Sequence, residues 1–110
     1  MDSSEQSNIL RSLTETLEGL LAWRVGVVEA SRQVSSARHT LGQDNHPLFM
    51  FFTGVDADTD RFPLGSVRQH WATDALARYD QERELAEQRW RPLVLEPAAE
   101  LLAWVRARAR

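Results

Sequence analysis

Three aspartates stand at alternate positions in the stretch GVDADTDRFP, directly after the most apolar run of the chain. A helix-loop-helix calcium site takes its first three oxygen ligands from alternate positions, and Asp56, Asp58 and Asp60 match that spacing. The match ends at the sixth position, where Arg61 replaces the glycine of the motif, and at the twelfth, where Val67 replaces the bidentate glutamate. The spacing therefore does not favour a calcium site, and we predict no bound metal at these residues.

Two interpretations of these carboxylates stay open. In the first, the aspartates cap local turns by accepting backbone hydrogen bonds, and Arg61 pairs with one of them. In the second, they form an acidic recognition surface: three like charges repel one another, a cationic partner relieves that repulsion, and Phe62 adds apolar contact. The second interpretation predicts a partner-binding site formed by Asp56, Asp58, Asp60, Arg61 and Phe62.

The other residues that could do chemistry form no recognised catalytic or metal-binding pattern. His39, His46 and His70 are 7 and 24 positions apart, so no two of them form the one-turn pair of a helical zinc site. Ser66 lacks the G-x-S-x-G turn of a nucleophile, and the chain has no cysteine, no lysine and no glycine-rich phosphate loop. We predict no catalytic residue and no cofactor. A metal-dependent enzyme that uses the three aspartates with His46 or His70 is kept as an alternative.

The C-terminus carries a short basic tail, with Arg106, Arg108 and Arg110 at alternate positions. A nucleic-acid-binding regulator that uses these arginines is a second alternative. The simpler interpretation is that cations favour the C-terminal end of a helix, where the helix dipole is negative. With 16 acidic and 13 basic residues the net charge is -3, so we do not expect nucleic acid to be the partner.

Length and composition point to one helical domain over residues 1–110, because 110 residues suffice for one hydrophobic core and 43% of them are hydrophobic. The N-terminus MDSSEQSNIL is polar, unlike a secretory signal, and no apolar run approaches the length of a membrane span. We expect a cytoplasmic protein with no membrane partner. All 13 basic residues are arginine, which is typical of a GC-rich bacterial coding sequence.

Apolar residues recur at steps of three and four in two stretches, 3–21 and 27–41, and predict two amphipathic helices. Gly42 follows the second as a natural stop. The small side chains between Val27 and Leu41 favour a close helix contact, and a homodimer through this stripe stays open. The four tryptophans are expected to fill the core.

The remaining elements are less regular. The short apolar run over 48–53 fits either a strand or a helical turn, and Pro47 and Gly54 beside it favour an extended segment. Pro92 is expected to kink or end a helix that starts near Asp74, and Pro97 to start another. The predicted fold is an all-α, compact bundle of four to five helices with one irregular or short extended segment near 48–53. The segment 54–65 is predicted to be a structured loop, with a short helix over 66–71 after it.

The stretch LFMFFTGVDADTDRFPLGSVRQHWATDAL resembles a pattern of small uncharacterised bacterial proteins: an apolar run, then D-x-[DE]-T-D, P-x-G and R-x-x-W. The positions that carry the resemblance are Asp56, Asp58, Thr59, Asp60, Pro63, Gly65, Arg68 and Trp71. It covers about a quarter of the chain and implies no activity.

The chain is therefore expected to be a non-enzymatic protein-binding module. The most concrete version is an immunity or antitoxin-like protein that neutralises a basic toxin or nuclease, because such proteins are small, acidic and without catalytic groups of their own. Its partner would be a protein with a basic surface.

Overall fold

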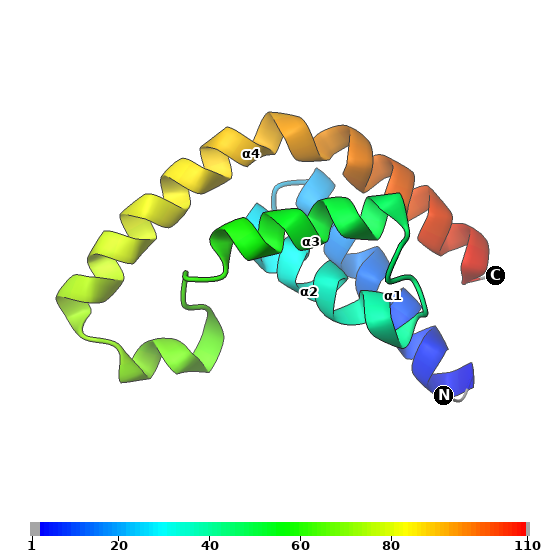
Figure 1. Cartoon of the computed structure of the whole chain (residues 1–110), viewed down its shortest axis with the longest axis horizontal. Helices are drawn as coiled ribbons and strands as arrows, with labels where there is room; N and C mark the ends of the chain where they lie inside the picture. The colour runs from blue at the N-terminus through cyan, green and yellow to red at the C-terminus, as the bar shows by residue number, and fades with distance from the viewer. Residues whose placement is uncertain (1–2, 110) are drawn as a thin grey trace.

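The computed structural model describes residues 3–109, which form four α-helices and one 3-10 helix, with no strand in that range. α4 is a long curved helix that arches over α1, α2 and α3 (Figure 1). The predicted all-α bundle is confirmed. In chain order the elements are α1 (Ser3–Leu21), α2 (Val27–Thr40), α3 (Pro47–Thr59), the 3-10 helix η1 (Gly65–His70) and α4 (Thr73–Arg108).

α1 and α2 form where their apolar periodicity predicts them. Leu13, Leu17 and Leu20 of α1 are buried, since steps of three and four keep them on one face of the helix. α2 ends at Thr40, and Gly42 follows in the left-handed region with φ of 68°, which costs glycine little. The turn between the two helices places Trp23 at φ of 58°, and its side chain is 44% exposed.

The predicted extended segment over 48–53 is wrong: these residues are helical and belong to α3. Pro47 starts the helix, and Nδ1 of His46 accepts a hydrogen bond from the Leu48 N–H at 3.2 Å. The helix buries Phe49 and Phe52, one turn apart, against the other helices. In a run where nearly every residue is apolar, the sequence shows no alternation that marks one face of a helix. Packing against the other helices therefore decides which of these residues face inward. The segment 54–59 is likewise helical, where a loop was expected.

Pro92 was expected to kink or end a helix, and it does not end one, because α4 is continuous from Thr73 to Arg108. The new helix start expected at Pro97 is wrong for the same reason. Each proline leaves the carbonyl four residues earlier without its helical donor, and those carbonyls belong to Gln88 and Leu93. Both of these residues are exposed on α4, where water can satisfy the carbonyl. The helix bends at this point and continues, convex toward solvent (Figure 1).

The core has a main cluster among the four α-helices and a smaller one beneath the chain that leaves α3. The smaller cluster consists of Val28, Phe62 and Ala86, with Tyr79 and Trp90 packed against it. The tryptophans divide between core and surface: Trp90 and Trp104 pack against the core clusters, whereas Trp23 and Trp71 are exposed, contrary to expectation. No helix in residues 3–109 has the length and apolarity needed to cross a membrane.

Candidate functional site: the acidic end of α3

The three aspartates lie on the last turn of α3 and at its C-cap, and the helix turns their side chains apart. Residues two positions apart on an α-helix are rotated by about 200°, so Asp58 projects away from Asp56. Asp56 is directed to α2, where its carboxylate lies 3.7 Å from Nε of Arg32. Asp58 is directed to α4, and Asp60 caps the helix. The carboxylates therefore do not converge on one point.

Arg32 of α2 holds the C-terminal end of α3 in place. Its Nη2 donates hydrogen bonds to the backbone carbonyls of Thr59 at 3.1 Å, Asp60 at 3.3 Å and Phe62. The Thr59 carbonyl also accepts the N–H of Phe62 at 3.2 Å. The guanidinium supplies a donor to the Asp60 and Phe62 carbonyls, which lie beyond the last helical hydrogen bond of α3. The aspartates were expected to stabilise this turn by accepting backbone hydrogen bonds. The turn is stabilised mainly by Arg32, an arginine from another helix, which donates to its carbonyls.

Asp58 makes the contact between the end of α3 and α4. Its Oδ2 lies 3.5 Å from Nη2 of Arg89 and accepts a hydrogen bond of 3.3 Å from the indole N–H of Trp90. The side chains of Asp58 and Arg89 are 51% and 61% exposed, so water and salt screen this ion pair. Arg61 donates to the backbone carbonyl of Asp58 at 2.8 Å.

Asp60 has the most available carboxylate of the three. The residue is exposed, and its carboxylate makes no ion pair with any residue between 3 and 109. Phe62, in contrast, is 1% exposed and packed in the smaller core cluster, so the apolar partner contact expected of it is not offered at the surface. The guanidinium of Arg61 lies 4.3 Å from the Phe62 ring, and its Nε lies 3.8 Å from Glu82.

Residues 3–109 contain no group of three or more His, Cys, Asp or Glu side chains placed so that they could hold a metal ion. The alternative of a metal site at the three aspartates with His46 or His70 therefore has no matching cluster in this part of the chain. His46 lies edge-on to the rings of Phe49 and Trp104, at 5.6 and 5.3 Å between centroids. His39 lies 3.2 Å from Asp44, far along the chain from the aspartates of α3.

The basic tail is engaged with the bundle. Arg106 lies 2.8 Å from the carboxylate of Glu18 on α1, and the guanidinium of Arg108 stacks 3.7 Å from the Trp104 ring. Arg110 lies outside the described residues. Arg106 therefore forms an ion pair within the bundle, and Arg108 forms a cation–π contact with it.

Two charged contacts were not foreseen from the sequence. Glu87 of α4 is 8% exposed, and its carboxylate accepts hydrogen bonds from the N–H groups of Val27 at 2.7 Å and Val28 at 3.0 Å. It caps the N-terminus of α2 from about 60 residues away in the chain, a distance at which no local motif gives a signal.

The second contact joins η1 to α4. Both terminal nitrogens of Arg68 donate to the carboxylate of Asp80, each at 2.7 Å. The hydrogen bonds from Arg68 hold the pKa of Asp80 below its ordinary value, with smaller charge effects from Arg68 and Arg83. Arg68 and Trp71 belong to the R-x-x-W pattern, and the Trp71 ring packs edge-on to Tyr79 at 5.2 Å. This part of the pattern closes the η1–α4 turn.

Comparison with known proteins finds no relative for this arrangement: no family model, no curated protein and no solved structure matches the chain. Any statement about function therefore rests on the residues themselves and on their geometry.

Proposed function

We propose that the chain is a non-enzymatic protein-binding module that recognises a basic protein through the acidic end of α3. In its most concrete form it is an immunity or antitoxin-like protein that neutralises a basic toxin or nuclease. The observation that carries the proposal is the exposed carboxylate of Asp60, which has no ion pair in residues 3–109 and follows, two positions along the chain, the half-exposed carboxylate of Asp58.

Three physical effects support this placement. The C-terminal end of α3 carries a partial negative charge, part of which Arg32 neutralises, and the remainder adds to the two carboxylates. Arg89 holds Asp58 only by a screened surface pair, worth about 1 kcal/mol or less, so an arginine of a partner can replace it at little cost. Complementary charge of this kind speeds encounter and selects a basic partner over others.

The test is capture of partners from the source cells on the immobilised chain, identification by mass spectrometry, and calorimetry with the purified partner. We expect a basic protein whose affinity falls about tenfold when Asp58 and Asp60 are both changed to asparagine, with a smaller salt dependence. The matched control is the double variant Glu15→Gln and Glu29→Gln, which makes the same charge change at exposed positions of α1 and α2.

Three results would contradict the proposal. Unchanged affinity in the aspartate variant removes the end of α3 from the interface. Equal loss in the control variant means that net charge alone, and no particular site, drives binding. A captured partner that is acidic contradicts the charge argument as a whole.

A further inference from the structure

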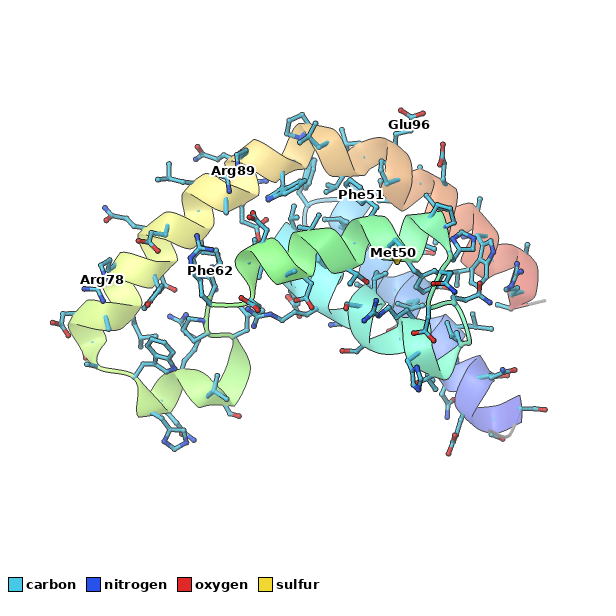
Figure 2. All side chains as sticks on the ribbon, in the orientation of Figure 1. Met50, Phe51, Phe62, Arg78, Arg89 and Glu96 are labelled. Atoms are coloured by element: carbon cyan, nitrogen blue, oxygen red, sulfur yellow. The ribbon has the colours of Figure 1, made fainter. Side chains whose placement is uncertain are left out.

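A hollow of about 310 Å³ lies at the N-terminal end of α2, next to the carboxylate of Glu87 that caps this helix. Phe62 of the chain that leaves α3 lies between the end of α3 and α4, as Figure 2 shows, and Leu64 two residues later reaches the hollow. We call it the Trp23 hollow. Its lining comes from the turn after α1, from α2, from the chain after α3 and from α4, and includes Trp23, Glu29, Leu64, Arg83, Glu84 and Arg91.

Trp23 lines the hollow from a backbone conformation that favours glycine. Its φ is 58°, and its N–H donates to the carbonyl of Leu20 at 3.1 Å where α1 ends. The ring is 44% exposed, so burial in the core does not account for a tryptophan at this position. The guanidinium of Arg91 lies 5.3 Å from the ring centroid. Trp23 therefore holds this guanidinium at the wall of the hollow.

Arg91 lacks the carboxylate partner that its position on α4 offers. Glu87 stands four residues earlier, the spacing of a helical ion pair, but its two oxygens accept the N–H groups of Val27 and Val28. Arg91 is exposed and makes no ion pair with a residue between 3 and 109. Its planar fork of N–H donors can therefore bind a carboxylate group of a ligand.

The same hollow contains two carboxylates that make no ion pair in the described part of the chain, those of Glu84 on α4 and Glu29 on α2. Glu84 precedes Arg91 by seven positions, which is two helical turns or about 10 Å along the axis of α4. This separation exceeds the one-turn spacing at which helical ion pairs form. Arg83 also lines the hollow, but it pairs with Asp80 at 3.6 Å. Opposite charges thus face one hollow without neutralising each other.

We infer that the Trp23 hollow binds a small zwitterion, an α-amino acid with an apolar side chain. The carboxylate of the ligand binds the guanidinium of Arg91, and its ammonium group binds the carboxylates of Glu84 and Glu29. The apolar side chain contacts Leu64 and the ring of Trp23.

The distribution of charge favours a zwitterion over an ion of either sign. An amino acid carries its ammonium and carboxylate groups on one carbon, so it bridges an arginine and a glutamate that do not meet. A simple anion would leave Glu84 and Glu29 unneutralised, and a simple cation would do the same to Arg91. The volume of the hollow is at the lower end of small-molecule sites, which suits a ligand of amino-acid size. This inference goes beyond the proposed function and does not rest on it.

The probes are glycine, leucine and phenylalanine, together with two analogues of leucine that each keep one charge. 3-Methylbutylamine lacks the carboxylate of leucine, and 4-methylpentanoate lacks its ammonium group. Binding is followed at neutral pH and low salt from NMR shifts of the backbone amides and of the Trp23 indole N–H. We expect leucine and phenylalanine to bind with dissociation constants of about 1 mM or less, and glycine and both analogues at least fivefold more weakly. The largest shifts are expected at Trp23, Gly26, Glu84 and Arg91.

Two charge variants test the walls of the hollow. Arg91→Gln and Glu84→Gln each remove one charge at an exposed position, and each should weaken leucine binding at least fivefold. The controls Arg78→Gln and Glu100→Gln make the same changes at exposed positions elsewhere on α4 and should alter binding less than twofold. Arg78 is a close match for Arg91, because its guanidinium also lies over an aromatic ring, 5.5 Å from the centroid of Tyr79.

Several outcomes overturn the inference. Absence of saturable shifts with all three amino acids up to about 10 mM removes the ligand class. An analogue that binds as tightly as leucine shows that one charge suffices, so the hollow is no zwitterion site. Equal loss in the control variants assigns binding to net charge, and shifts centred on the hollow between α1 and α2 that Ile9 and Leu13 line place the ligand elsewhere. Each result leaves the proposed function standing, because capture of a basic partner is measured separately.

Discussion

Changing Glu87 to alanine is expected to lower the free energy of unfolding by about 3 kcal/mol, a large effect for one polar side chain. The carboxylate accepts the first two N–H groups of α2, those of Val27 and Val28, whose side chains are 0% and 1% exposed. Without Glu87 neither N–H has a partner, and each buried orphan costs about 1–3 kcal/mol. Loss of one ordinary helix cap costs about 0.5–2 kcal/mol, and the value of about 3 kcal/mol is larger because two buried N–H groups lose their acceptor at once.

The isosteric change separates hydrogen bonding from packing. Glu87→Gln keeps one acceptor oxygen but turns an NH₂ group toward the other N–H, so it should cost about 1.5 kcal/mol with the shape retained. Glu84→Ala is the control on the same helix, since Glu84 is exposed and makes no ion pair in residues 3–109; it should change stability by less than about 0.5 kcal/mol.

A double-mutant cycle with Gly26 tests the same contact independently. A Cβ on Gly26 would lie 2.8 Å from Oε1 of Glu87, so alanine there requires the carboxylate to shift and strains its two hydrogen bonds. The backbone at Gly26, with φ of -75° and ψ of 161°, suits any residue. Gly26→Ala should therefore cost about 1 kcal/mol less in the Glu87→Ala background than in the wild type.

The measurement is urea unfolding at neutral pH, followed by circular dichroism and tryptophan fluorescence. A loss below about 1 kcal/mol for Glu87→Ala, or a Gly26→Ala cost that is the same in both backgrounds, would refute the reasoning that the carboxylate caps α2.

Three further outcomes follow from other contacts. Gly54→Ala should raise the unfolding free energy by about 0.5–1 kcal/mol, since the added Cβ meets nothing within 4 Å; an unchanged urea midpoint would contradict this. Arg32→Ala should cost about 2 kcal/mol by freeing the carbonyls at the end of α3, and Arg32→Lys should restore only part of that in the same assay. NMR titration should find the pKa of Asp80 below its ordinary value, and Arg68→Gln should return it there. Because that pKa is lowered, the contact stabilises the fold above the pKa of Asp80 in the unfolded chain and is lost as the pH falls through the lower folded value.

The candidate site was predicted in part. The carboxylates of Asp56, Asp58 and Asp60 could be named from the sequence, because charge and spacing are visible there. Their directions could not, because alternate positions point the same way on a strand and about 200° apart on a helix. Phe62 could not be placed either, since an apolar residue after an acidic segment is equally compatible with surface and core until Val28 and Ala86 are found against it.

The sequence by itself determined the all-α class and the ends of α1 and α2, because steps of three and four between apolar residues mark one face of a helix without reference to anything else. Tertiary structure decided the rest. The run at 48–53 is apolar on every side, so only packing against the neighbouring helices makes it part of a helix and turns Phe49 and Phe52 inward. Pro92 is tolerated because the carbonyl it frees lies on the outer curve of α4. Glu87 caps α2 because folding brings together residues that are about 60 positions apart, and no local pattern encodes that meeting.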